Sequence, residues 1–363
     1  MTSHCPAGTY DANYGQDSSI ARTQLQRVFL IAGIILIFAA PWYLGSDLLT
    51  QLNEIGIYII VASGVFIAIS CGIVNLGQAG FMCIGAFTSG ILCSTAGFSL
   101  WGALPIAIIA SGLMGVLCGL TLSRIKGFIA AVVTIAVGII IPEMFMIILP
   151  MLDLPAEAVS LPEGISIGGK VLGSQGLYLL IWVLVLLTAL LVLNLSRSKT
   201  GRAFRGTRDN ELVSEAVGLN IRRHKIVALL VCSILAGIGG WLWACHYSSI
   251  SAGAFRFTLS LECLGIVVLG GMGSVGGIFI GSVIVLGIKF ALSNYLLPWL
   301  EDMFMTGPWY GVLPLGDLIG RLGGITPLLL GIIFILVFTF SPSGMVGWWN
   351  KFKTYYRLWP LPG

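Results

Sequence analysis

Charged residues are scarce in this 363-residue sequence. Lys and Arg number 19 and Asp and Glu 15, so only 9% of the chain is charged, against roughly 25% in a typical globular protein. Hydrophobic residues make up 57%. So few charges cannot cover the surface of a soluble protein of this size. The composition therefore excludes a cytosolic enzyme, a disordered chain, a collagen and a disulfide scaffold.

Other scarcities narrow the range of functions further. Three His are scattered at 4, 224 and 246, and no two of the eight Cys form a CxxC pair. We therefore predict no metal site and no cofactor, and we interpret the Cys as small buried hydrophobes. A net charge of +4 is too small to indicate nucleic acid binding. The phosphate-binding loop GxxxxGK[ST] is absent, so the chain does not hydrolyse ATP in the usual way, and HExxH is absent too.

Long continuous apolar runs are what the sequence does contain, and they indicate membrane-spanning helices. A helix needs about 20 apolar residues to cross the bilayer core, and the runs do not alternate as barrel strands do. We predict an all-α, polytopic membrane helical bundle with about ten transmembrane segments. The segments are residues 28–44, 48–70, 76–96, 101–123, 127–151, 177–195, 226–247, 259–272, 275–297 and 324–340. The eighth is short and is expected to be a half-helix or a kinked span.

The distribution of Lys and Arg over the loops predicts the orientation. With the N-terminus inside, most basic residues fall on the cytoplasmic side, and the outside loops receive only Lys170, Arg256 and Arg321. Both termini are therefore expected to be cytoplasmic. Residues 1–27 form a polar tail, 28–347 the transmembrane domain with an internal loop at 197–225, and 348–363 a C-terminal tail. The first span is expected to stay uncleaved.

The internal loop carries the most specific local pattern. Asp209 and Asn210 are good N-cap residues, Glu211 suits the first turn of a helix, and Gly218 suits its C′ position. Leu212, Val213, Ala216 and Val217 share one face at helical spacing. We predict a short amphipathic helix over 209–218, which is too short to be stable alone and is expected to dock on a soluble partner.

The same region resembles the permeases of ABC importers of the branched-chain amino acid type, in the LivM-like branch. The resemblance is carried by GRAFRGTRDNELVSEAVGLNIRRHKIVALLVCSILAGIGG at 201–240 and FRFTLSLECLGIVVLGGMGSVGGIFIGSVIV at 255–285. IVNLGQAGFMCIGAFTSGIL at 73–92, SRIKGFIAAVVTIAVGIIIPEMF at 123–145 and GIIFILVFTFSPSGMVG at 331–347 extend it. It covers roughly residues 52–347.

The resemblance implies a transport function and a set of partners. The chain is expected to be a permease subunit in a bacterial or archaeal cytoplasmic membrane, where it contacts membrane lipid. Its implied partners are two ABC ATPase subunits, a second permease subunit and a periplasmic or extracellular solute-binding protein, with no nucleic acid. The implied solutes are branched-chain or related amino acids, with urea or short amides as an alternative. An ion-coupled secondary transporter and, more weakly, a membrane enzyme stay open as other functions.

Three sets of candidate residues follow. The resemblance makes the short cytoplasmic helix the contact with the ATPase, through Arg205, Arg208, Asp209, Glu211, Glu215, Ala216, Gly218 and Asn220. Polar residues within spans are candidates for the translocation path because charges at membrane depth are costly: Asn75, Gln78, Glu262 and Lys289. Glu54 and Glu143 are expected to be solvated at the interface. Glycines pack helices closely, and Gly270, Gly271 and Gly273 are the hinge candidates.

Overall fold

Helices make up nearly all of the part of the chain that the structure describes. The computed structural model describes residues 24–125, 127–155, 158–161, 166–167, 170–171, 173–296, 298–299, 331–332, 335, 339 and 344–347. The helices are α2 (Gln24–Tyr43), α3 (Ser46–Ser70), α4 (Gln78–Thr95), α5 (Leu100–Leu122), α6 (Phe128–Met151), α7 (Ser174–Arg197), α8 (Lys199–Asp209), α9 (Glu211–Ala216), α10 (Ile221–Tyr247), α11 (Phe257–Gly270), α12 (Val275–Ala291), and the short η1 (Ala252–Phe255) and η2 (Leu292–Leu296). This is the predicted all-α helical bundle.

Six stretches of helix in the described residues are long and apolar enough to cross a membrane. They are Ser46–Ser70, Leu100–Leu122, Ile129–Met151, Ser174–Arg197, Ile221–Tyr247 and Val275–Leu296. Ile31–Tyr43 and Phe257–Gly270 are shorter apolar helices, the second of them at the predicted short eighth segment. The predicted third segment forms the 18-residue α4. Most of the predicted tenth segment, most of the N-terminal tail and the whole C-terminal tail lie outside the described residues.

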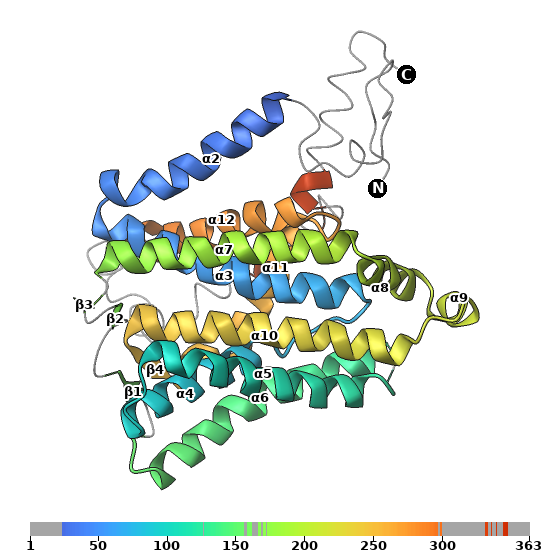
Figure 1. The fold of residues 1–363 in the computed structure, drawn as a ribbon, viewed down its shortest axis with the longest axis horizontal. Coiled ribbons are helices and arrows are strands. Elements are labelled where there is room, and N and C mark those ends of the chain that lie inside the picture. The colour runs from blue at the N-terminus through green and yellow to red at the C-terminus, as the bar shows by residue number, and fades with distance from the viewer. Residues whose placement is uncertain are drawn as a thin grey trace, which may run out of the picture.

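Helix α10 lies at the centre of the bundle. It packs on α3, α4 and α5, while α3 also contacts α7, α11 and α12. Figure 1 shows α3, α5, α7, α10 and α12 running side by side. Glycines permit these close approaches: a Cβ at Gly85 of α4 would collide with the backbone of Gly237 in α10, and one at Gly240 with the backbone of Met82. Such contacts supply packing energy where lipid offers little hydrophobic drive.

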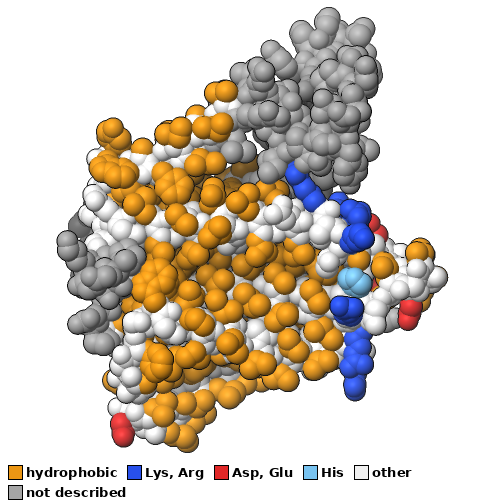
Figure 2. All heavy atoms as spheres, in the orientation of Figure 1, with side chains coloured by type: hydrophobic (Ala, Val, Ile, Leu, Met, Phe, Trp, Pro, Cys, Tyr) orange, Lys and Arg blue, Asp and Glu red, His pale blue; other side chains and the backbone are white. Residues whose placement is uncertain are grey.

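The flanks of the bundle expose apolar side chains. Ile109, Leu113 and Leu117 on α5 are more than half exposed, and Leu187 on α7 is too. Figure 2 shows this apolar surface along the side of the molecule, with Lys and Arg gathered at the end that bears α8 and α9. Exposed apolar patches of this extent mark a surface that another apolar medium covers. The flanks are therefore suited to lipid and the charged end to water.

Short strands close the end of the bundle opposite α8 and α9. β1 (Ala158–Ser160) pairs antiparallel with β4 (Ser249–Ser251), with Val159 opposite Ile250, and β2 (Ser166–Ile167) pairs with β3 (Lys170–Val171). Val159 and Ile250 are buried, and Gly90 of α4 lies against both. These strands were not predicted from the sequence. Their β1–β4 pairing ties the loop after α6 to the end of α10.

Candidate functional site

The internal loop folds into two helices instead of the single predicted one. Helix α8 begins after Ser198, whose hydroxyl accepts a hydrogen bond from the Gly201 amide at 3.2 Å. Its buried face consists of Gly201, Ala203, Phe204 and Thr207. Helix α9 begins after Asn210, whose Oδ1 accepts from the Val213 amide at 3.2 Å. Both starts are typical side-chain N-caps.

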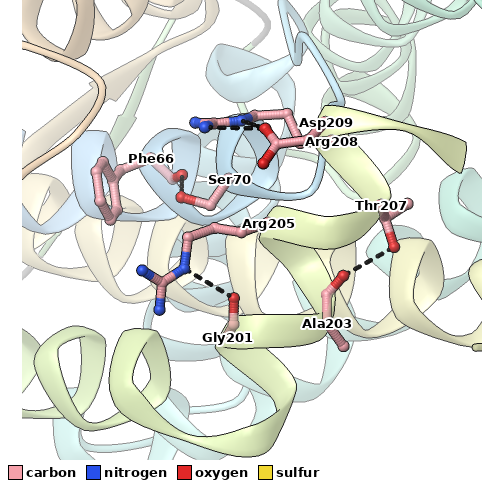
Figure 3. A network of polar contacts seen from close by, with 8 residues as sticks. All are labelled: Phe66, Ser70, Gly201, Ala203, Arg205, Thr207, Arg208 and Asp209. Atoms are coloured by element: carbon pink, nitrogen blue, oxygen red, sulfur yellow. Dashed lines mark hydrogen bonds and ion pairs between the residues drawn. The ribbon is translucent and has the colours of Figure 1, made fainter. Parts of the chain in front are cut away.

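Asp209 does not belong to the second helix, and this part of the prediction is wrong. It is the last residue of α8, where its carboxylate lies 3.3 Å from the Arg208 Nε. Figure 3 shows this pair at the end of α8. The Asn210 backbone is extended, with φ −160° and ψ 110°, which breaks one helix and starts the next. The helix boundary therefore lies one residue later than the sequence indicated, and α9 spans only six residues.

Gly218 ends α9 as predicted. Its φ is +90°, a conformation that glycine adopts without the strain imposed on other residues. The Leu219 amide donates to the Ser214 carbonyl at 3.0 Å, and the Gly218 amide donates to Glu215 at 2.9 Å. This is a Schellman C-terminus. Caps at both ends thus define a helix that is too short to persist on propensity alone.

The apolar face of α9 is open to the surroundings. Leu212, Val213 and Val217 are 70%, 58% and 77% exposed, and Glu215 and Ala216 are exposed as well. Of the helix residues only Ser214 is buried, facing Gly206 of α8. Figure 1 shows α9 projecting beyond the ends of the long helices. The chain thus presents a small apolar patch flanked by charge at the polar end of the bundle.

An ion pair joins α9 to the central helix α10. Lys225 Nζ lies 2.6 Å from Glu211 Oε1, and the Lys225 side chain is only 7% exposed against 31% for Glu211. Cys71, at the end of α3, lies close to this pair, and burial raises the pKa of its thiol to about 12. Glu211 is among the residues predicted from the sequence, whereas Lys225 is not. The sequence does contain a signal for Lys225: it precedes Ala228 and Leu229 by three and four residues, which places it on the same buried helix face.

Other named residues of the loop hold it to the bundle. Arg205 donates to the Ser196 carbonyl at 2.7 Å and to Gly201 at 3.4 Å, so its guanidinium braces α8 against the end of α7. The Cα of Arg208 lies against Gly72, in the turn that follows α3. Asn220 caps α10 by accepting from the Arg223 amide at 3.0 Å. Within this chain, these residues therefore position the loop on the bundle.

Asn75 and Gln78 form a buried network. Asn75 Nδ2 donates to Gln78 Oε1 at 2.9 Å, Gln78 Nε2 donates to the Val61 carbonyl at 2.9 Å, and Cys232 Sγ lies 3.1 Å from Gln78 Oε1. Both side chains are fully buried. The network joins α3, α4 and α10, which is the usual role of polar residues between membrane helices. In this structure these two path candidates serve helix contact.

The hinge candidates lie in the tight turn between α11 and α12. A Cβ at Gly270 would collide with the Gly277 backbone, and Gly271 has φ +108°. Gly273 has open space around it, so it makes no close helix contact. Gly277 and Gly281 do pack on α11, against Gly270 and Ile266. The geometry here is that of close packing around a turn.

The structure brings Glu262 and Lys289 together and adds Glu54 to them. Lys289 Nζ lies 3.2 Å from Glu262 Oε2 and 3.7 Å from Glu54 Oε1. The expectation that Glu54 is solvated at the interface is therefore wrong, because its side chain is 24% exposed and faces a cation. Glu143 on α6 is exposed. Sequence reasoning missed the grouping because the three residues come from helices far apart in the chain.

The architecture by itself defines the class of protein. A bundle of long apolar helices carries paired charges inside it and a capped, exposed helix at its basic end. Among the described residues no group of three or more His, Cys, Asp or Glu side chains is placed to hold a metal ion. These features define a polytopic α-helical membrane protein.

Comparison with known proteins specifies the family. The family model described as branched-chain amino acid transport system / permease component matches residues 48–313, and the chain belongs to this family. It is therefore the permease subunit of an ABC importer and spans the membrane several times. No solved structure matches the chain.

Curated relatives agree with this assignment. The chain is 28% identical to the high-affinity branched-chain amino acid transport system permease protein LivM of Escherichia coli K12, over 72% of this chain and 67% of the relative. It is 23% identical to the probable branched-chain amino acid transport permease protein LivH of Methanocaldococcus jannaschii, over 78% and 87%. The autoinducer 2 import system permease protein LsrC of Escherichia coli DH10B is 23% identical, over 78% and 84%.

Proposed function

We propose that this chain forms one half of the translocation path for branched-chain or related amino acids, in the cytoplasmic membrane of a bacterium or archaeon. Two ATPase subunits supply the energy, a second permease completes the path, and a solute-binding protein outside delivers the solute. The permease of a branched-chain amino acid system is among the relatives, which supports this solute class. The absence of a phosphate-binding loop in the sequence requires a separate source of energy.

The exposed face of α9 is the observation that carries the proposal. Leu212, Val213 and Val217 offer an apolar contact, Glu215 adds a carboxylate beside them, and Ala216 permits close approach. A helix of six residues with this exposure gains stability when its apolar face is covered. The proposed cover is a groove on an ATPase subunit. Lys225 and Glu211 then join that contact to α10, and through α10 to the bundle.

The orientation follows from charge. Arg202, Arg205, Arg208, Arg222 and Arg223 all belong to the end of the bundle that carries α8 and α9. The positive-inside rule places this end in the cytoplasm. The β1–β4 end then faces outward, toward the proposed solute-binding protein. The ten-span count and the cytoplasmic position of both termini are parts of this proposal.

Two other solute classes are alternatives to amino acids. An LsrC permease is also a relative, so family membership leaves room for a solute other than an amino acid. Urea and short amides are the alternative from the sequence. The ion-coupled transporter and the enzyme are not favoured by the family assignment. The Glu262–Lys289 contact also shows that this carboxylate already has a cationic partner in the chain.

The experiment is uptake by proteoliposomes that contain the whole importer. We expect leucine uptake that requires ATP on the ATPase side and proceeds without an ion gradient. Glu215→Lys is expected to weaken uptake modestly, because an exposed ion pair contributes only about 0–1 kcal/mol. Ala216→Trp is expected to do more, because overpacking a tight contact costs about 1–3 kcal/mol. Both variants are expected to insert and fold normally.

Matched controls come from the opposite end of the bundle. Asp47, at the start of α3, and Ala96, after the end of α4, are both exposed. Asp47→Lys and Ala96→Trp repeat the same chemical changes there, and the ATPase should co-purify with both as with the unmodified chain. If both α9 variants show normal ATPase co-purification and normal uptake, α9 is not the contact with the ATPase. Uptake driven by a proton or sodium gradient alone would support the ion-coupled alternative.

A further inference from the structure

A three-residue charge cluster occupies the contact of α3, α11 and α12. Lys289 Nζ lies 3.2 Å from Glu262 Oε2 and 3.7 Å from Glu54 Oε1. The Tyr58 hydroxyl donates to the same Glu262 oxygen at 2.7 Å, and Lys289 Nζ lies 5.5 Å from the centre of the Tyr58 ring. Two carboxylates therefore face one ammonium, which leaves one negative charge in excess when all three are ionised.

The two carboxylates are not equivalent. Glu262 is 12% exposed and receives hydrogen bonds from both Lys289 and Tyr58. Glu54 is 24% exposed, and its separation from Lys289 is half an ångström longer. The Tyr247 hydroxyl is a further hydrogen-bond partner of Glu54. Glu262 is thus the fixed partner of Lys289, whereas Glu54 carries the excess charge on the more open side.

An open pocket of about 170 Å³ adjoins this more open side. Its polar lining consists of Gln51, Glu54, Lys289, Ser293 and Asn294, and its apolar lining comes from residues such as Phe290 and Leu286. The pocket is smaller than those that take drug-sized ligands, which are roughly 300–1,000 Å³. It offers a carboxylate, an ammonium and two amides beside an aromatic ring. These groups complement a small solute that carries both charges.

The charged lining of the pocket disfavours exposure to lipid. Glu54 lies near the start of α3, at the end of the bundle opposite α9, and about 12 Å along the helix from Ser46 at 1.5 Å per residue. Ionisable groups at such a depth face protein or a water-filled space, because hydrocarbon solvates them poorly. By contrast, the exposed positions on α5 and α7 include Leu113 and Leu187. The α3–α12 face is therefore turned toward a path or a neighbouring subunit.

We propose that this pocket is a solute subsite in the outer half of the translocation path, built to take a zwitterion. The solute's ammonium binds Glu54, its carboxylate binds Lys289, and its side chain lies toward Phe290. This assignment rests on the proposed function and adds to it the residues that select the charge pattern of the solute. Binding replaces the long Glu54–Lys289 contact by two new ion pairs, and the net charge of the site stays the same because the solute is a zwitterion. A neutral solute such as urea leaves the Glu54–Lys289 pair in place.

The test is protection of a thiol in the pocket of the complete importer. Asn294→Cys places a thiol on the lining, while the seven cysteines of the described part are buried and give little background. Its labelling by a cationic methanethiosulfonate is measured with added L-leucine, 4-methylpentanoate or isopentylamine. The last two lack the ammonium and the carboxylate respectively. We expect leucine to protect at concentrations at which neither analogue does.

Glu54→Gln, added to Asn294→Cys, is expected to raise the leucine concentration for half-protection roughly 10- to 100-fold, the usual loss for one charged hydrogen bond. Glu143→Gln on α6 is the matched control and should change nothing. Equal protection by all three compounds, or protection that Glu54→Gln leaves unaltered, would overturn the subsite. Absence of ATP-driven uptake by the unmodified importer, with protection intact, would instead contradict the proposed function and leave the subsite standing.

Discussion

Removing Glu211 and removing Lys225 from their ion pair are expected to differ in their cost to stability. Lys225 is almost fully buried, whereas Glu211 is about a third exposed. Glu211→Gln leaves a buried ammonium without its anion. Lys225→Met leaves a carboxylate that water can reach, and the methionine retains the apolar contacts of the lysine stem. We therefore expect Glu211→Gln to be the more damaging change, although Glu211 is the more exposed residue.

The expected magnitudes follow from burial. Removing one partner of a fully buried pair costs roughly 3–5 kcal/mol, and the partial exposure of Glu211 places Glu211→Gln near 3 kcal/mol, at the low end of that range. Lys225→Met is expected to cost about 1 kcal/mol, as for a solvated pair. The cost is confined to the attachment of α9 to α10. A loss of about 3 kcal/mol raises the population of the detached helix by roughly a hundred-fold.

Hydrogen exchange of the α9 amides measures this population directly. The amides of Ser214, Val217 and Leu219 donate within α9 and its C-terminal cap, so their protection reports the attached helix. We expect protection to fall far more in Glu211→Gln than in Lys225→Met, with the amides of α10 unchanged in both. ATP hydrolysed per solute transported should rise in the same order. Equal effects, or a larger effect of Lys225→Met, would refute the argument from burial.

Further changes test the caps and the packing of the bundle. Asn210→Ala removes the N-cap of α9 and should weaken uptake through a local loss of about 0.5–2 kcal/mol, visible as faster exchange of the Val213 amide. Gly218→Val forces a branched residue to φ +90° and should cost about 1–3 kcal/mol in the same helix, with less ATPase co-purified. Gly85→Val should instead lower the thermal stability of the whole bundle, by roughly 1–3 kcal/mol or more, because its Cβ meets the Gly237 backbone. A bundle as stable as the unmodified one would show that α4 and α10 are less tightly packed than the structure has them.

Local signals predicted the part of the site that local interactions build. Asn210 and Gly218 act through hydrogen bonds to residues within a few positions, so the short helix could be located from sequence. Its boundary was misplaced by one residue because Asp209 and Asn210 are both good N-caps, and only the extended backbone of Asn210 decides between them. Helix α8 was missed because its two glycines and its basic residues mask a short apolar face that includes Phe204.

Contacts between distant segments could not be derived in the same way. Apolar runs located the long helices, because helix length and hydropathy are properties of a single segment. Glu54 and Lys289 lie on different helices, and nothing in either segment indicates that α3 and α12 are neighbours. Lys225 likewise acquires its role only when α9 folds back on α10. The pairing of β1 with β4 depends on a similar long-range contact.

Site-specific cross-linking from α9 tests the central claim most directly. A photoreactive amino acid is placed at Val213, which is 58% exposed on α9, and for comparison at Leu187, which is 54% exposed on the apolar flank of α7. The whole importer is irradiated in the membrane. The account predicts a cross-link from position 213 to an ATPase subunit and none from position 187. If the importer is active in uptake but position 213 forms no cross-link to an ATPase subunit, the account is contradicted.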